Sequence, residues 1–211
     1  TGIIFKCEFV NNEPIGKGKV TNGRTGNIYE GQVDRKSGQL RPHGRGKMTW
    51  ANGNIFEGEF VNGLKNGKGK MTTKIGVYEG EYKEAKKEGR GKFTFAKNNV
   101  VVEAEWKNDE QKGQGKVLYP GNFQWAEYEG DLYGMQRHGK GKMLFRLNNY
   151  HKFLLYEGEW KYHEPHGHGK MIYQSGEIVE GQFEHGLLGL FKRVDSVELV
   201  EPTKPTSGAG P

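Results

Sequence analysis

The chain has 211 residues, a formal net charge of +6 and a sequence pI near 9.2, with 34 glycines and aromatic residues at 12%. The single cysteine, Cys7, excludes an intramolecular disulfide framework and every multi-cysteine zinc signature. No run of about 18 apolar residues occurs, so we expect neither a transmembrane helix nor a signal peptide in these residues.

Two short elements alternate along the chain. The first is an aromatic residue or Val, then Glu, then a small residue; in chain order it stands at 5–7 (as Phe-Lys-Cys), 29–31, 56–58, 78–80, 102–104, 128–130, 156–158 and 179–181. The second is Gly-x-Gly-Lys, at 16–19, 44–47, 67–70, 89–92, 113–116, 139–142 and 167–170. In six repeats, nine positions separate the small residue from the first glycine, and an eighth, degenerate copy at 186–189 is expected of a terminal capping unit.

A period of 22 to 28 residues with two alternating runs predicts one β-hairpin per repeat. In the copy at 78–95, a turn at Ala85-Lys86 would pair Tyr82 with Gly89, Glu81 with Arg90, Gly80 with Gly91, Glu79 with Lys92 and Tyr78 with Phe93. One face would then carry rings lying over glycines, and the other would carry Glu opposite Lys or Arg.

Apolar residues two and four places beyond the second glycine extend the ring-bearing face. They are Met48 and Trp50, Phe93 and Phe95, Val117 and Tyr119, Met143 and Phe145, and Met171 and Tyr173. The chain is therefore predicted to be all-β, a single-layer twisted antiparallel solenoid of about eight hairpins.

The segment YEGEYKEAKKEGRGKFTF at 78–95 resembles the MORN (membrane occupation and recognition nexus) repeat. The resemblance covers Phe5 to Phe191, so we expect a solenoid over 1–191 and a flexible tail or linker over 192–211. Cys7 and Ala104 replace the repeat's first glycine, and Val33 and Leu132 replace its second aromatic residue. The resemblance implies a scaffold of ciliary radial spokes, of the axoneme or of the cytoskeleton.

Three catalytic or ligand-binding alternatives are weaker than the structural interpretation. No helix follows any Gly-x-Gly, which argues against a phosphate-binding loop. His163, His166 and His168 lie near Glu164 as zinc ligands would, but two of these histidines fall in a predicted turn. Cys7 occupies a glycine position rather than that of an activated nucleophile. We therefore expect no enzyme activity, no metal and no cofactor.

The excess of lysine and arginine makes nucleic acid and anionic lipid the partners to consider. Six of the seven repeats that contain Gly-x-Gly-Lys offer a glutamate across the strand from that lysine, so most of the positive charge is predicted to be neutralised in place. We expect no nucleic-acid binding and at most weak binding to anionic lipid. The alternative function is a phosphoinositide or membrane-surface module of a larger protein.

We expect a non-catalytic scaffold that binds other proteins of an assembly, or a copy of itself. The predicted anchors are Trp125, Trp106, Trp160 and Tyr133, because Trp and Tyr dominate interface hot spots. Core packing is the stronger interpretation at Trp106 and Trp160, whereas Trp125 lies in a connection outside the strict pattern. The cysteine usage fits a reducing compartment, the cytoplasm by default.

Overall fold

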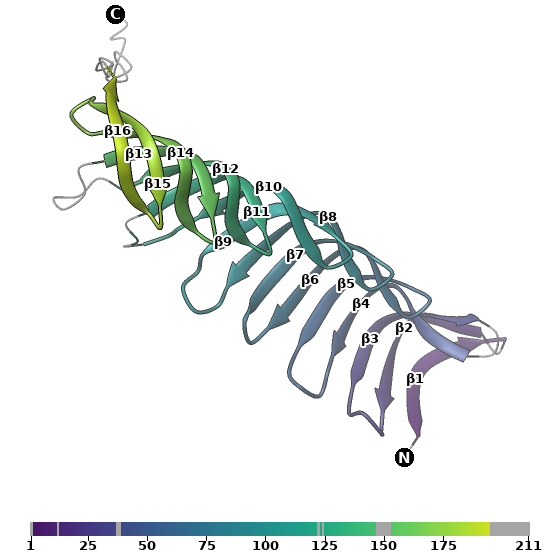
Figure 1. Cartoon of the computed structure of the whole chain (residues 1–211). Coiled ribbons are helices and arrows are strands. Elements are labelled where there is room, and N and C mark those ends of the chain that lie inside the picture. Colours follow the sequence, from purple (N-terminus) through teal and green to yellow (C-terminus); the bar gives the residue numbers. More distant parts are fainter. Residues whose placement is uncertain are drawn as a thin grey trace, which may run out of the picture.

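The computed structural model describes residues 2–11, 13–36, 39–121, 123, 125–146 and 153–194. Every regular element in these residues is a β-strand, which confirms the all-β prediction. One antiparallel sheet of 16 strands runs in chain order from β1 to β16 (Figure 1). The strands are β1 (Ile3–Val10), β2 (Glu13–Asn22), β3 (Ile28–Lys36), β4 (Gln39–Thr49), β5 (Ile55–Val61), β6 (Leu64–Thr73), β7 (Gly76–Lys83), β8 (Lys86–Phe95), β9 (Val101–Lys107), β10 (Glu110–Leu118), β11 (Trp125–Tyr133), β12 (Gln136–Phe145), β13 (Phe153–Lys161), β14 (Glu164–Tyr173), β15 (Ile178–Glu184) and β16 (Leu187–Val194).

Each repeat forms one hairpin, from β1–β2 to β15–β16, and successive hairpins pair with one another along the sheet. The last strand ends at Val194, three residues beyond the predicted solenoid boundary at 191. Residues 195–211, most of the predicted tail, lie outside the described residues.

The predicted packing of rings on glycine is confirmed. In the hairpin β7–β8, Gly80 pairs with Gly91 and Tyr78 with Phe93, and a Cβ added at Gly91 would meet the Tyr78 ring. Tyr78 is 1% exposed. The same contact recurs between Tyr29 and Gly46, Phe56 and Gly69, Tyr128 and Gly141, and Tyr156 and Gly169.

The turn of this hairpin is one residue earlier than predicted. Glu84 and Ala85, rather than Ala85 and Lys86, form the two-residue turn, and both have positive φ, 50° and 70°. Positive φ at both central residues is the geometry that matches the twist of hairpin strands. The predicted pairing of Tyr82 with Gly89 is therefore wrong, because Tyr82 pairs with Lys87.

The first glycine of each pair lies in a bulge. Gly89 and Arg90 are passed over within their own hairpin, so the predicted partner of Arg90 is also wrong. They pair instead with Trp106 and Glu105 in the next hairpin. Gly89 has a φ of 64°, which glycine adopts without steric cost. The bulge thus joins each hairpin to its neighbour.

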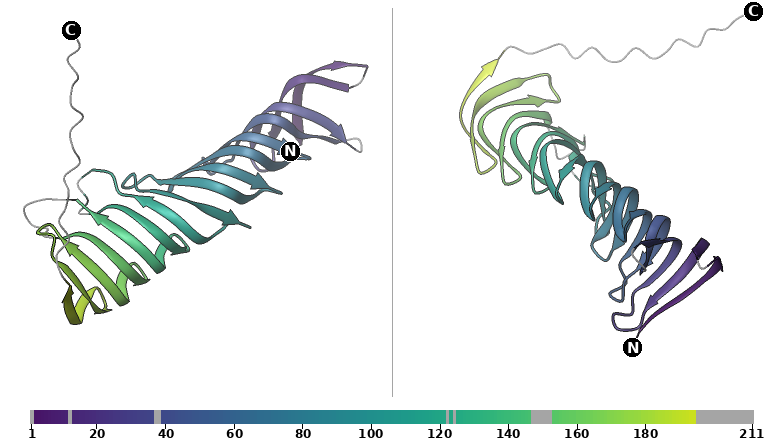
Figure 2. Two further views of the ribbon diagram at one scale, coloured as in Figure 1. Left: turned by 90° about the horizontal axis from the view of Figure 1, so that it is seen from above. Right: turned by 90° about the vertical axis from the view of Figure 1, so that its right-hand side faces the viewer.

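The strands bend so strongly that the sheet forms a trough. Tyr78 and Tyr82 are four residues apart on β7, yet their ring centroids are separated by only 5.4 Å. On a straight strand the same residues would be about 13 Å apart. The curved strands follow one another along the sheet (Figure 2). We call the concave, ring-bearing side the trough and the opposite side the outer face.

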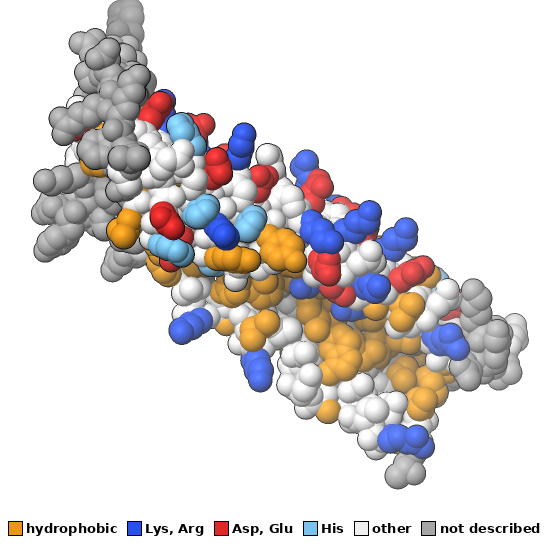
Figure 3. Space-filling model, in the orientation of Figure 1, with side chains coloured by type: hydrophobic (Ala, Val, Ile, Leu, Met, Phe, Trp, Pro, Cys, Tyr) orange, Lys and Arg blue, Asp and Glu red, His pale blue; other side chains and the backbone are white. Residues whose placement is uncertain are grey.

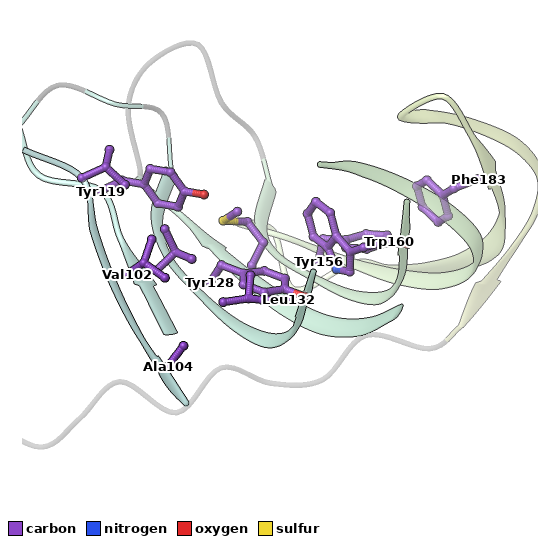
Figure 4. Close-up of a cluster of buried hydrophobic side chains, with 11 residues drawn as sticks. Val102, Ala104, Tyr119, Tyr128, Leu132, Tyr156, Trp160 and Phe183 are labelled. Carbon is purple, nitrogen blue, oxygen red and sulfur yellow. The ribbon is translucent and has the colours of Figure 1, made fainter. Parts of the chain in front are cut away.

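Buried tyrosines hold the bend by hydrogen bonds. The hydroxyl groups of Tyr29, Tyr128 and Tyr156 each donate to the carbonyl oxygen three residues further along, at 2.6, 2.7 and 2.9 Å. Edge-to-face ring contacts link consecutive hairpins, from Tyr128 to Trp160 and from Tyr156 to Phe183 (Figure 4). Hydrogen bonds therefore stabilise the bend of a hairpin, and ring contacts attach it to its neighbours.

The hairpin turns stack along one edge of the trough. The backbone N–H of Ala85 donates to the carbonyl oxygen of Lys65 in the preceding hairpin at 2.8 Å, and Asp109 donates likewise to Lys87 at 3.1 Å. The same bond is repeated from Gly63 to Pro42, from His163 to Arg137 and from Gly186 to Pro165. Except at Pro42, this ladder joins the second turn residue of a hairpin to the residue that lies two places beyond the turn of the preceding hairpin.

Candidate functional site

The trough has a floor of aromatic rings in two stretches, one from Tyr29 to Trp106 and one from Tyr128 to Phe183. Its most buried members are Tyr29, Phe56, Phe60, Tyr78, Tyr82, Trp106, Tyr128, Tyr156, Trp160 and Phe183, all between 0% and 4% exposed. Met48, Trp50, Met71 and Phe95 pack against this floor but are only partly buried. Hydrophobic side chains are visible along the hollow, most openly over the N-terminal half (Figure 3).

One side of the trough is lined by the residues that pair with the second trough-facing residue of each hairpin, which is an aromatic ring in most of them. In the middle hairpins these are Lys65 opposite Phe60, Lys87 opposite Tyr82, Gln111 opposite Trp106 and Arg137 opposite Leu132. We call Lys65, Lys87 and Arg137 the cation row. Proline takes the same position in flanking hairpins, at Pro42 and Pro165.

Lys65 and Lys87 lie over the ring floor. The Nζ atom of Lys65 is 4.6 Å from the Tyr82 ring centroid, and that of Lys87 is 4.4 Å from the Trp106 centroid. Burial lowers the pKa of both ammonium groups. Neither forms an ion pair within the described part of the chain. Ring faces attract cations but leave their charge uncompensated.

One acidic side chain acts on both lysines, and it already accepts a backbone hydrogen bond. Asp109, in the turn of the following hairpin, raises the pKa of both lysines by its charge. Its carboxylate oxygen accepts a hydrogen bond from the backbone N–H of Lys87 at 2.9 Å, rather than from either ammonium group. The two lysines therefore keep donor capacity that the described residues do not use.

Arg137 is more deeply buried, at 5% exposed, between the rings of Trp125 and Trp160. Its guanidinium carbon is 4.9 Å from the Trp125 centroid and 4.8 Å from the Trp160 centroid, and its Nε has no hydrogen-bond partner. Burial lowers the pKa of this side chain. A buried cation without a carboxylate is costly, and the ring sandwich offsets only part of that cost.

Gln111 interrupts the stacking of the turns. The Met135 backbone N–H donates to the Gln111 side-chain oxygen at 3.0 Å, where other turns use a backbone carbonyl. Beside this insertion lies a cavity of about 300 Å³, lined by Trp106, Gln111, Tyr133, Met135 and their neighbours. The 3%-exposed Gln111 side chain therefore separates two hairpins along this edge.

The outer face carries Lys–Glu pairs, but most of those described join a lysine to the glutamate of the following hairpin, rather than to that of its own hairpin as predicted. Ion pairs join Lys19 to Glu30 at 2.9 Å, Lys47 to Glu57 at 3.2 Å and Lys70 to Glu79 at 3.2 Å, with Lys92 4.0 Å from Glu79 on its other side. Their side chains are about half exposed, so each pair contributes little to stability. Their main effect is to balance charge across this face.

Charge balance on the outer face differs along the sheet. A central hollow of about 860 Å³ has equal numbers of cationic and acidic side chains in its lining. A hollow of about 630 Å³ near the N-terminal end is lined by five cationic side chains, Lys6, Lys17, Lys19, Arg45 and Lys47, but only two carboxylates, Glu30 and Glu57. Positive potential on this face is therefore concentrated at the N-terminal end.

The four predicted anchors lie in different environments. Trp106 and Trp160 are each 4% exposed, so they are part of the floor, as the core-packing interpretation holds, and are not surface anchors. Trp125 is the first residue of β11 rather than part of a connection, and it is partly buried against Tyr119 and Arg137. Tyr133 is 64% exposed beside the 300 Å³ cavity.

Of the three clustered histidines only His163 lies in the hairpin turn, because β14 begins at Glu164 and includes His166 as well as His168, which corrects the prediction of two turn histidines. Within the described ranges, no group of three or more His, Cys, Asp or Glu side chains is arranged to hold a metal ion. His163 Nδ1 accepts the Arg137 backbone N–H at 3.5 Å, and His185 lies 3.4 Å from Glu164. These imidazoles are used between neighbouring turns.

The cation row is not among the predicted site residues, although the sequence contains a signal for it. When the repeats are aligned on their second glycine, the residue four places earlier is Pro42, Lys65, Lys87, Gln111, Arg137 and Pro165 in successive hairpins. A long polar residue is therefore confined to the middle of the series.

Nowhere in the described residues is there a helix with the length and apolar character of a membrane span.

Comparison with known families agrees with this architecture. The MORN repeat model matches residues 41–55, 56–76, 78–100, 103–122, 128–146 and 156–178, together more than half of the chain. The matches begin within β4 and end at the first residue of β15. No curated protein matches the sequence. The repeat matches show that the chain belongs to the MORN repeat family.

Proposed function

We propose that this protein is a non-catalytic scaffold that binds a segment of another protein in its trough. MORN repeats generally mediate interactions with proteins or membrane lipids, and proteins built from them are generally non-catalytic. The observation that carries the proposal is the partly exposed apolar lining of the trough, at Met48, Trp50, Met71 and Phe95. Apolar surface of this kind, bordered by polar residues, is typical of protein interaction sites.

The shape of the trough favours a protein segment over a membrane. A flat layer of lipid headgroups cannot follow a concave surface, whereas a peptide can lie along it. Lys65 and Lys87 are partly buried beside the ring floor, so they are recessed from any planar surface laid across the trough. Desolvated aromatic and hydrogen-bonded contacts with a peptide would also resist salt better than exposed charge contacts.

A second candidate function rests on the N-terminal hollow of the outer face. Its excess of cations, with Lys17 and Arg45 among them, would attract a phosphoinositide headgroup. Each basic residue near an anionic surface contributes about 1 kcal/mol. We rank this second, because acidic side chains balance the central hollow.

For the cellular setting we propose the cytoplasm, and within it a ciliary, axonemal or cytoskeletal assembly. This placement rests on the resemblance to MORN proteins of such assemblies and on the single cysteine. A multi-subunit assembly would use the length of the sheet, since each hairpin repeats the trough surface.

Pull-down from lysate alongside liposome co-sedimentation at 0.15 M salt separates the two functions. At this salt the Debye length is about 8 Å, so we expect weak retention by phosphoinositide liposomes and retention of specific proteins. Met71→Glu, in the trough, should lose those proteins, whereas Thr72→Glu, the next residue on the outer face, should keep them.

Tight liposome binding that disappears in Lys17→Gln/Arg45→Gln, with no protein retained, would overturn the scaffold proposal and support the second candidate. Equal protein retention by Met71→Glu and Thr72→Glu would show that the trough is not the binding face.

A further inference from the structure

We propose that the cation row selects an acidic partner: an extended peptide segment of another protein, with carboxylates directed at Lys65 and Lys87 and apolar residues between them. This inference rests on the proposed protein-binding function of the trough and specifies its ligand. Charge complementarity carries it, because both ammonium groups lie in the trough without an ion pair in the described residues.

The contrast between the two faces supports the assignment. On the outer face, Lys70 pairs with Glu79, and the equivalent lysines Lys19 and Lys47 also have acidic partners. In the trough, Lys65 and Lys87 have ring faces beneath them and only Asp109 nearby, whose carboxylate accepts a backbone N–H. The charges left uncompensated in this part of the sheet therefore point to a ligand that enters the trough.

A carboxylate would gain more here than at an exposed lysine. Burial lowers the pKa of Lys65 and Lys87, and Lys87 contributes to the shift at Lys65 by repulsion. An incoming carboxylate would relieve both effects and form charge-assisted hydrogen bonds in a partly desolvated site. The apolar residues of the segment would meet Met71 and Phe95, which are partly buried on the same face.

The spacing of the row defines the segment. Lys65 on β6 and Lys87 on β8 hold equivalent positions two strands apart, about 10 Å along the sheet. Three residues of a polyproline II segment advance about 9 Å and complete one turn, so acidic residues at i and i+3 would face the two lysines. Gln111 on β10 would meet residue i+6. The occupant we infer is thus extended, with acidic residues three apart.

Short synthetic peptides test the inference. The probes carry two Glu residues at separations from one to eight on an Ala/Leu/Pro background, with Gln-for-Glu copies, at 0.15 M salt. We expect the i, i+3 peptide to bind most tightly and its Gln copy about tenfold more weakly. Lys65→Met/Lys87→Met, which keeps most of each side-chain stem, should lose about the same factor.

Two matched variants provide controls. Lys68→Met/Lys70→Met removes the same charge from the outer face and should bind as the wild type does, while Lys65→Arg/Lys87→Arg should retain affinity. The inference is wrong if Gln peptides bind as well as Glu peptides, if no Glu peptide binds, or if the outer-face variant loses as much. If the tightest-binding peptide has its two Glu residues seven positions apart, the occupant is helical, and the inference of an extended segment is wrong.

Failure here is distinguishable from failure of the scaffold proposal. If Lys65→Met/Lys87→Met retains the same lysate proteins as the wild type and Met71→Glu loses them, the trough binds protein without selecting carboxylates. If phosphoinositide liposomes bind the wild type and only Lys65→Met/Lys87→Met loses that binding, the ligand of the two lysines is a lipid phosphate. The peptide assignment would then be wrong.

Discussion

Gly91→Val is expected to destabilise the protein far more than Lys92→Ala, although the two residues are adjacent. A Cβ at Gly91 would lie within about 2.5 Å of the Tyr78 ring, which is itself buried. Such overpacking costs about 1–3 kcal/mol, and the branched valine adds further atoms under the ring. Lys92 is 45% exposed and 4.0 Å from Glu79, so losing it should cost well under about 1 kcal/mol.

Urea denaturation of both variants measures this difference in the free energy of unfolding. The slope of the transition serves as the control, because an unchanged slope shows that the same surface is exposed on unfolding. Equal losses for the two variants would mean that the assignment of the trough and the outer face is reversed.

Alkaline pH is expected to unfold the protein through its buried tyrosines. Burial raises the pKa of Tyr29 to about 12, and it also raises the pKa values of Tyr78, Tyr82, Tyr128 and Tyr156. A tyrosine in the unfolded chain ionises near pH 10. Stability from these residues is thus complete below pH 10 and falls above it, by up to about 1.4 kcal/mol per tyrosine for each pH unit.

Tyr82→Phe is the matched variant for this measurement. The Tyr82 hydroxyl has no hydrogen-bond partner, so its removal should not reduce stability at neutral pH. Above pH 10 the variant should lose stability less steeply. Lys65 and Lys87 have the opposite effect on stability, because burial lowers their pKa values in the folded state. As the pH rises toward 10.5, these lysines lose their protons in the folded protein first, which removes a desolvation penalty and increases stability. Stability that stays constant to about pH 11 would contradict the burial of these rings.

The repeat pattern of the sequence is sufficient to predict the sheet and its two faces. Gly80 opposite Gly91 and Tyr78 opposite Phe93 follow from the strict spacing, because only glycine leaves room for a ring from the facing strand. The Glu79–Lys92 pairing follows from the same register. Period-two alternation then places every other residue of a hairpin on one face or the other.

The turn and the bulge could not be predicted in the same way. Glu84 and Ala85 both take positive φ, yet neither is a residue typical of such turns, so local sequence gives no signal. The position is set by the neighbouring hairpin, where the Ala85 N–H donates to the Lys65 carbonyl and Gly89 pairs with Trp106. These contacts form only after the hairpins stack.

The environment of the predicted anchor residues could not be predicted from the sequence either, because it also depends on how the strands curve. Aromatic residues are plausible hot spots in any sequence, but Trp106 and Trp160 pack into the floor because strand curvature closes the sheet around them. That curvature depends on the strand bend at each glycine and on hydrogen bonds across the bend, such as the one that the Tyr156 hydroxyl donates to the Glu159 carbonyl oxygen. Lys65 and Lys87 become part of the trough for the same reason, and in the sequence only their position four places before the second glycine of each repeat marks them.

Site-specific photo-crosslinking at Met71 and Thr72 tests the claim that the trough is the protein-binding face most directly. The two residues are adjacent on β6 and both are partly buried, but Met71 packs against the ring floor and Thr72 belongs to the outer face. We predict that a photoreactive residue at Met71 forms an adduct with a partner protein in cells and that one at Thr72 does not. Adducts at Thr72 alone, or equally at both positions, would contradict the account.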